Sequence, residues 1–133
     1  YFDPDADWVL TGSFTPTQGR IDIGSSTGGT TAYELAGHLT VTVHGETHRL
    51  MVLHGEEDEL FIPFRDATAG DTTYGGGRYA PATRTGPEEA TVDFNRAVNP
   101  YCAYDEEFSC PLPPPDNWLP FPVPAGELAY VPA

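Results

Sequence analysis

The chain has 133 residues, with 20 acidic and six basic side chains and a net charge of -14. This length fits one domain with a substantial hydrophobic core. A surface this acidic would repel nucleic-acid phosphates and anionic lipids, and no apolar run is long enough for a membrane span, so neither nucleic acid nor membrane is expected as a partner.

All six basic residues are arginines, and the acids are scattered along the chain without forming a long run. Acid-rich chains without lysine are typical of a salt-saturated cytosol, where surface carboxylates hold water and screening removes their repulsion. The composition therefore favours a halophile and a cytoplasmic location. A high-GC soil bacterium is the competing source. The first residue is Tyr1, which leaves open that the chain is a fragment of a longer protein.

Short strands are predicted through residues 1–98, separated by loops rich in Gly, Ser, Thr and Asp. The expected strands are residues 8–14, 20–23, 31–35, 38–44, 47–54, 60–64, 74–79 and 90–94. Residues 80–88 are expected to be a loop. Pro63 cannot donate a ladder hydrogen bond, so its strand should be at an edge or bulged there.

Residues 38–54 give the clearest hairpin. With Gly45 and Glu46 as a two-residue turn, Val43 would pair with His48, and Leu39 with Val52. The apolar residues of both strands then share one face. His44 and His48 resemble a zinc-binding HExxH motif, but that motif requires a helix, and the hairpin places the two histidines on opposite faces. No metal site is therefore predicted.

The composition changes after Asn95, where prolines accumulate and are interleaved with aromatic residues. Prolines exclude a helix and a central strand, while the aromatic content is too high for a disordered linker. We expect residues 99–126 to form an irregular, Pro-rich wrap on the body of the domain, and residues 127–133 to include a closing strand. The fold class is all-β: a small antiparallel barrel or sandwich of about seven to nine short strands.

Residues 64–79, FRDATAGDTTYGGGRY, concentrate polar chemistry between apolar strands. Three consecutive glycines there would let a backbone or a ligand approach closely. Together with the later polar positions, this stretch supplies the candidate ligand-binding residues, which are Arg65, Asp66, Tyr74, Gly75, Gly76, Gly77, Arg78, Asp93, Asn95 and Trp118.

The motifs FRDATAGDTTYGGGRY, VDFNRAVNPYCAY and SCPLPPPDNWLPFPVPAGE resemble the family filed as domain of unknown function 1684, most strongly over residues 64–127. The resemblance implies that the chain corresponds to the C-terminal half of family members, which carry an additional N-terminal region. Many members have a lysine near the end of this region, where Leu128 stands here. The family has no established activity, so the resemblance supplies motif boundaries and no chemistry.

Three interpretations of the polar residues remain open. In the first, the acids and arginines form a buried structural network that fixes the wrap. In the second, Arg65 and Arg78 bind a small anionic or polyol-like ligand between walls formed by Tyr74, Tyr79 and Trp118. The third is an enzyme, hydrolase-like or dependent on a flavin or nucleotide, that uses Arg65, Asp66, Arg78 and Asp93. A non-catalytic binding or structural module is favoured, because no nucleophile motif is present. No cofactor is predicted.

The two cysteines, Cys102 and Cys110, lie in one irregular segment. A disulfide would close a short loop there, whereas a reducing cytosol would keep both as thiols. A structural zinc would need two further ligands. The disulfide or thiol pair is favoured over a metal site, and a disulfide would indicate a location outside the cytoplasm.

Overall fold

The computed structural model describes residues 1–55, 59–104 and 110–129. Its strands are β1 (Val9–Pro16), β2 (Arg20–Gly24), β3 (Thr30–Val43), β4 (Glu46–His54), β5 (Leu60–Phe64), β6 (Arg78–Gly86) and β7 (Glu89–Asp93). Among the described residues, four short 3-10 helices accompany them: η1 (Ala6–Trp8), η2 (Phe94–Arg96), η3 (Tyr101–Ala103) and η4 (Pro115–Asn117). In the part of the chain that the structure describes, no helix is long and apolar enough to cross a membrane.

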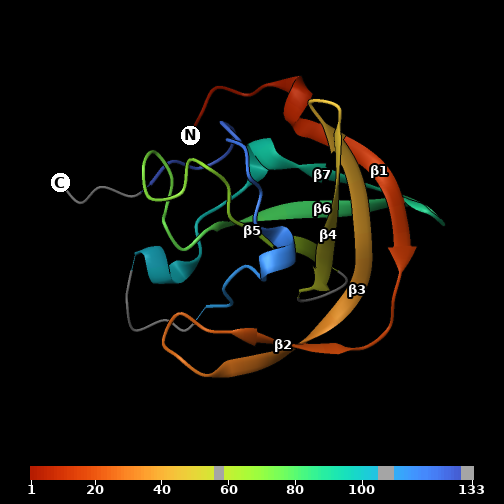
Figure 1. The fold of residues 1–133 in the computed structure, drawn as a ribbon, viewed down its shortest axis with the longest axis horizontal. Helices are drawn as coiled ribbons and strands as arrows, with labels where there is room; N and C mark the ends of the chain where they lie inside the picture. The colour runs from red at the N-terminus through yellow and green to blue at the C-terminus, as the bar shows by residue number, and fades with distance from the viewer. Residues whose placement is uncertain (56–58, 105–109, 130–133) are drawn as a thin grey trace.

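The strands form an antiparallel sheet in the order β1-β7-β6-β5-β4-β3-β2, and an additional pairing of β1 with β3 closes six of them into a barrel (Figure 1). The seventh strand, β2, pairs with residues 30–34 of β3, which extend beyond the barrel as a two-stranded arm. This arrangement confirms the all-β, antiparallel fold class.

The barrel closes at β1, which pairs with β7 along its first half and with β3 along its second half. Gly12 stands where the strand passes from one partner to the other. A Cβ atom built on Gly12 would lie 1.9 Å from the carbonyl oxygen of Thr40, so only glycine permits the two backbones to approach this closely.

The β3–β4 hairpin forms as predicted, but the predicted register is wrong by two residues. Val43 pairs with Glu46, and Leu39 pairs with Leu50. The turn residues are His44 and Gly45, with φ of 52° and 80°. A tight hairpin turn favours positive φ at both central residues, and Gly45 serves as the second of them. Because a shift of two residues preserves the alternation of faces, the predicted apolar face is still buried.

Two predicted boundaries around β6 are wrong. Residues 74–77 belong to a turn, and residues 80–86, expected as a loop, form most of β6. Pro81 is compatible with a strand here. The backbone N–H of Tyr79 donates to the carbonyl of Val98. The backbone nitrogen of Pro81, two residues further along the strand, points toward the same neighbouring segment, at the place where β7 ends. The missing N–H of Pro81 therefore costs no ladder hydrogen bond.

The barrel interior is filled by side chains from all six barrel strands together with the end of the chain. Ala90, Val92 and Phe94 are fully buried, which confirms the predicted alternation of β7. Phe94 packs edge-on against Phe64 with ring centroids 4.9 Å apart.

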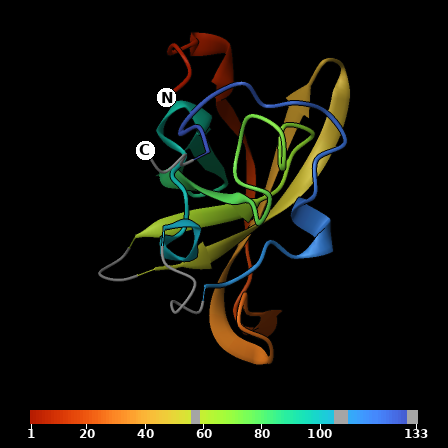
Figure 2. The same ribbon diagram turned by 90° about the vertical axis from the view of Figure 1, so that its left-hand side faces the viewer.

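The described residues of the C-terminal wrap, 99–104 and 110–126, cross the barrel as irregular chain with two 3-10 turns, η3 and η4. The later part of the wrap arches past the loop that precedes β6 (Figure 2). The described residues 127–129 form no strand. The remainder of the expected closing strand, residues 130–133, lies outside the described residues.

Asn117 in η4 joins two barrel strands that have separated. β4 and β5 pair only at Leu53 with Phe61 and at His54 with Leu60. Beyond that point, the Asn117 amide donates to the carbonyls of Met51 (3.0 Å) and Pro63 (2.7 Å). Its Oδ1 accepts the N–H of Met51 at 2.7 Å. One buried side chain thus completes the ladder where Pro63 lacks a donor. The predicted edge position or bulge at Pro63 is wrong, because β5 is an inner barrel strand without a register shift, and its pairing with β4 ends before Pro63.

Candidate functional site

Arg78 and Asp66 form a buried ion pair beneath the C-terminal wrap. Arg78, at the start of β6, is only 1% exposed, and its Nη2 lies 3.4 Å from Oδ1 of Asp66. The guanidinium also donates to the carbonyls of Val123 (3.1 Å) and Ala125, and it lies over the ring of Phe64. Burial lowers the pKa of Arg78, and the nearby Asp66 carboxylate opposes that shift.

The Asp66 carboxylate accepts hydrogen bonds from Thr68, Arg78 and Val123. Its Oδ2 accepts the N–H of Val123 at 2.6 Å, and it also accepts both the N–H and the hydroxyl of Thr68. Its Oδ1 faces Arg78. We call Asp66, Arg78 and the Val123–Ala125 backbone the wrap joint. It supplies hydrogen bonds to a proline-rich segment that has no ladder of its own.

Gly77 lets the wrap lie directly on the turn before β6. Its φ is 95°, and an added Cβ would lie 2.6 Å from both Phe64 O and Pro113 Cγ. The close approach predicted for the glycine run is therefore an approach of the chain's own backbone and of Pro113. Gly76 and Gly75 precede it in the same turn.

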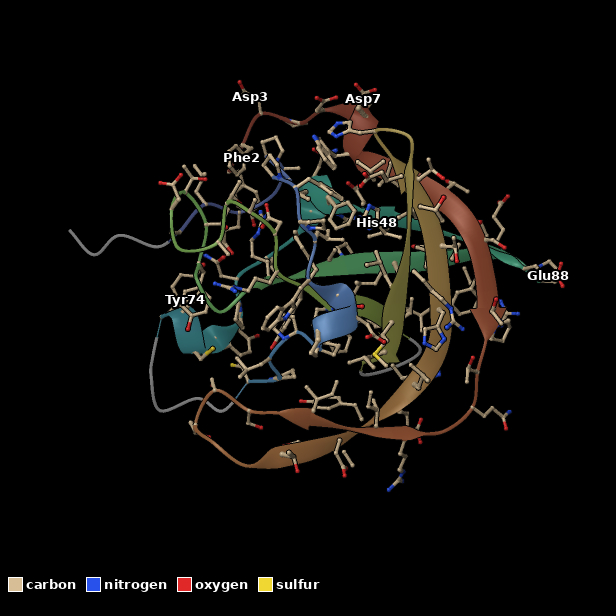
Figure 3. The ribbon with its side chains drawn as sticks, in the orientation of Figure 1. Phe2, Asp3, Asp7, His48, Tyr74 and Glu88 are labelled. Carbon is tan, nitrogen blue, oxygen red and sulfur yellow. The ribbon has the colours of Figure 1, made fainter. Side chains whose placement is uncertain are left out.

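Arg65 and Trp118 lie on the outer surface of the wrap. They form a parallel β-bridge, and the Arg65 guanidinium lies 5.6 Å from the centre of the indole. Arg65 Nε donates to Gly75 O at 3.1 Å. Trp118 is 53% exposed, and its indole N–H donates to Pro113 O. Tyr74 lies beside η3, as Figure 3 shows, and its hydroxyl donates to Cys102 Sγ at 3.7 Å.

Asp93 and Asn95 do different work, at the junction of η2 with the N-terminal segment. The Asp93 carboxylate caps η2 by accepting the Asn95 N–H. The Asn95 side chain in turn exchanges two hydrogen bonds with the backbone of Asp5. The predicted candidate residues are thus divided among the wrap joint, the outer surface and this junction.

The two hairpin histidines converge instead of facing opposite sides. The rings of His44 and His48 lie 6.1 and 5.0 Å from the ring of Phe121 in the wrap. His48, labelled in Figure 3, comes from the inward-facing set of β4. The predicted opposition of the two histidines is wrong because His44 occupies the turn itself. Within the described ranges, no group of three or more His, Cys, Asp or Glu side chains is placed to hold a metal.

A cleft of about 1030 Å³ lies on the outer face of β5 and β6. Its walls come from the β2–β3 arm, the sheet face, and the segments on either side of η3. Aromatic and proline side chains dominate the walls: Tyr33, Phe61, Tyr79, Pro81, Tyr101 and Pro111. We call this hollow the aromatic cleft.

Arg84 and Arg96 bring positive charge to the aromatic cleft, and Glu59 brings the opposite charge. The Arg84 guanidinium is already occupied, since it donates to the carbonyls of Gly86 (3.2 Å) and Pro87 (2.7 Å). Arg96 is exposed and makes no hydrogen bond or ion pair with the described residues. Its guanidinium therefore offers a full set of donors at the cleft.

Tyr79 forms the floor of the aromatic cleft. Its hydroxyl donates to Pro111 O at 2.8 Å. Burial raises the pKa of Tyr79 far above its usual value, and Cys110 and Cys102 add to the shift, so the phenol stays protonated. The hydroxyl of Tyr79 thus holds Pro111 in place, and its ring lines the cleft.

Sequence reasoning missed this cleft because its residues come from distant segments and carry no motif. The usable signal was the outward-facing set of β6, in which Tyr79 and Pro81 alternate with the buried Arg78 and Ala80. That alternation is hidden when residues 80–88 are taken for a loop.

Cys102 and Cys110 are both buried thiols in the structure, next to the aromatic cleft. The backbone N–H of Cys102 donates to Sγ of Cys110 at 3.2 Å. Burial raises the pKa of the Cys110 thiol, and its side-chain hydrogen bond with Cys102 raises it further. The disulfide between them stays a prediction.

A solved structure with the same fold is the solution NMR structure of the uncharacterized protein from gene locus rrnAC0354 of Haloarcula marismortui. It is 37% identical in sequence and superposes with a TM-score of 0.77 over 96% of this chain and 74% of that chain. A comparison with curated proteins gives no match.

The family described as "Protein of unknown function (DUF1684)" matches residues 1–128. The similarity thus covers nearly the whole chain, whereas the sequence motifs indicated a correspondence with the C-terminal half of the family. On these two comparisons, the chain belongs to the DUF1684 family.

Proposed function

We propose that this protein is a binding module for a small organic anion with an aromatic or apolar body, which it holds in the aromatic cleft. The observation that carries the proposal is the composition of the cleft: four aromatic rings line a hollow of about 1030 Å³, and the exposed Arg96 adds donors that no described side chain uses. Pockets of this size with apolar walls and few polar groups are typical of small-molecule sites.

The charge balance of the chain supports an anionic ligand. With a net charge of -14, the protein as a whole repels anions, and a bound anion needs local positive charge. Arg84 and Arg96 supply two of the six basic side chains to one cleft. Arg78, one of the two arginines of the predicted site, is buried and is engaged by the wrap joint.

A binding role is favoured over catalysis at the predicted carboxylates. Asp66 is engaged by Arg78, Thr68 and Val123, and Asp93 caps η2. Paired acid and base groups would have to share one site with a substrate, and these two carboxylates have separate structural partners.

The proposal is tested with the fluorescent probe 8-anilinonaphthalene-1-sulfonate, which combines aromatic rings with one anionic group. Wild-type protein is expected to bind it, and Arg96→Gln to weaken binding by roughly tenfold, the loss of about one charge-assisted hydrogen bond. Tyr101→Ala, which removes one wall, is expected to weaken binding as well. Titrations are run at one salt concentration, because screening weakens the ionic part.

Two matched variants serve as controls. Arg49→Gln removes an exposed arginine from β4, outside the cleft, and Trp118→Ala removes the exposed indole of the wrap. Both are expected to bind the probe as the wild type does. Binding that depends on Trp118 and is indifferent to Arg96 would refute the proposal and favour the Arg65–Trp118 surface.

A further inference from the structure

The two cysteines occupy the rim of the aromatic cleft. Tyr101, which lines the cleft and is 73% exposed, directly precedes Cys102 in η3. Pro111, which also lines the cleft, directly follows Cys110. Each thiol is therefore covalently adjacent to a wall residue of the proposed ligand site.

The two thiols belong to different walls. Residues 110–112 pair with the end of β2: Cys110 exchanges backbone and side-chain hydrogen bonds with Ser26, and the Leu112 N–H donates to Gly24 O. Cys102 instead belongs to η3, whose turn is closed by hydrogen bonds from Ala103 and Tyr104 to the preceding residues. A bond between the sulfurs would tie η3 to the wall that continues into the β2–β3 arm.

Their placement suits a short-range bond. The residues are eight positions apart, and Sγ of Cys110 lies 3.2 Å from the backbone nitrogen of Cys102, so it is already beside the partner residue. A disulfide requires nearby Cα atoms and side chains directed at each other. The 3.2 Å contact places the Cys110 sulfur against the backbone of its partner residue.

We propose that Cys102 and Cys110 form a reversible disulfide that fixes the rim of the aromatic cleft and thereby strengthens ligand binding. The regulatory part rests on the function proposed above. In the oxidised protein, the disulfide orders the wall that carries Tyr101 before the ligand binds. Binding is then stronger, because less conformational entropy is lost when the ligand binds.

The oxidant is a low-molecular-weight disulfide. One cysteine thiolate attacks a sulfur of the oxidant and expels one thiolate, which takes up a proton. The second cysteine then attacks the protein sulfur of the mixed disulfide and expels the other. Two protein thiols are oxidised to one disulfide, and the oxidant is reduced to two thiols.

The first test treats native protein with oxidised glutathione and measures intact mass. The expected result is a loss of ~2 Da with no retained glutathione, reversed by dithiothreitol. Oxidation should also raise the Tm by roughly 5 °C or more, because the bond restricts the unfolded chain. The Cys110→Ser variant should retain one glutathione at Cys102 or stay unmodified, and its Tm should not rise.

The second test measures binding of 8-anilinonaphthalene-1-sulfonate before and after oxidation. The wild-type dissociation constant is expected to fall several-fold on oxidation and to return with reductant, while Cys102→Ser/Cys110→Ser does not respond. A mixed disulfide that persists in native protein, or a bond that forms only after unfolding, overturns the proposed disulfide.

The two proposals fail in distinguishable ways. A disulfide that forms without changing probe affinity overturns the regulation and leaves the binding function standing, provided that Arg96→Gln weakens binding. If Arg96→Gln has no effect, the binding function fails, and with it the regulation. The mass measurement still decides whether the disulfide exists.

Discussion

Arg78 and Arg96 use positive charge in different ways, and the contrast separates the wrap joint from the aromatic cleft. Arg78 is buried, paired with Asp66, and surrounded by backbone carbonyls of the wrap. Arg96 is exposed at a cleft with aromatic walls and has no partner among the described residues. The segment in which the sequence concentrates polar residues thus forms a structural joint, whereas the candidate ligand site contains few polar side chains.

The physical reason is the wrap itself. A proline-rich segment cannot pair as a strand, so its carbonyls need donors from side chains, and a buried guanidinium supplies several in a fixed geometry. A ligand site has the opposite requirement, because its donors must stay free until the ligand arrives. Substitutions in the two regions should therefore separate stability from binding.

The largest expected effect is at the wrap joint. Arg78→Met keeps much of the side-chain volume, but it leaves the buried Asp66 carboxylate without its cation and the carbonyls of Val123, Ala125 and Glu127 without this donor. We expect a loss of about 3–5 kcal/mol in the free energy of unfolding, measured by urea denaturation.

The double variant Asp66→Asn/Arg78→Met provides the control. Removing the orphaned charge should recover part of the lost stability, because the cost of a broken buried pair lies largely in the charge left behind. Unchanged stability of Arg78→Met, together with lost probe binding, would reverse the contrast and make Arg78 a ligand-binding residue.

The next effect concerns the second attachment of the wrap, at η4. Asn117→Ala removes three hydrogen bonds that join the separated strands β4 and β5. The backbone groups of Met51 and Pro63 then lack partners in a buried place, which should cost about 2–4 kcal/mol of unfolding free energy in the same assay.

Asp116→Ala is the matched control, because Asp116 is the exposed neighbour of Asn117 in η4. It should change the unfolding free energy by less than about 0.5 kcal/mol. Probe binding in the aromatic cleft should survive in the folded fraction of both variants. Equal stability of Asn117→Ala and Asp116→Ala would show that η4 does not support the barrel.

The all-β class and the buried faces of β3, β4 and β7 could be predicted because they depend on alternation, which a local sequence displays. The hairpin register could not be predicted, because the sequence signal favours a turn at Gly45 and Glu46. The structure instead uses His44 and Gly45 as the turn, and His44 adopts a positive φ although it is not a glycine. β6 was missed because Pro81 is harmless only next to the end of β7, and that is a tertiary fact.

The candidate site was harder to predict than the fold. Polar density at Arg65, Asp66 and Arg78 was visible in the sequence, but whether these groups face a ligand or the chain's own carbonyls depends on where the wrap lies. The aromatic cleft combines Tyr33, Phe61 and Tyr101 from three distant segments, and each of these residues alone is typical of an ordinary core or surface.

The smallest expected effect is a pH dependence at His38, on the outer side of β3 near η4. Burial lowers the pKa of His38 from 6.5, Arg49 lowers it further, and Asp116 opposes both. The unfolded chain therefore takes up a proton at a higher pH than the native protein does. The contribution of His38 to stability is complete above about pH 7 and is lost as the pH falls through 6.5 toward the lower native value.

Comparison of urea midpoints at about pH 7.5 and pH 5.5 measures this contribution. Wild type should lose more stability between these two values than His38→Gln does, by less than about 1 kcal/mol because solvent screens the partly exposed ring. Asp116→Asn should enlarge the loss, since it removes the carboxylate that favours protonated His38 in the native state. The exposed His54 supplies the control, and His54→Gln should follow wild type. If Asp116→Asn instead diminishes the loss, then the Asp116 carboxylate does not favour protonated His38, which contradicts the placement of these two side chains near each other.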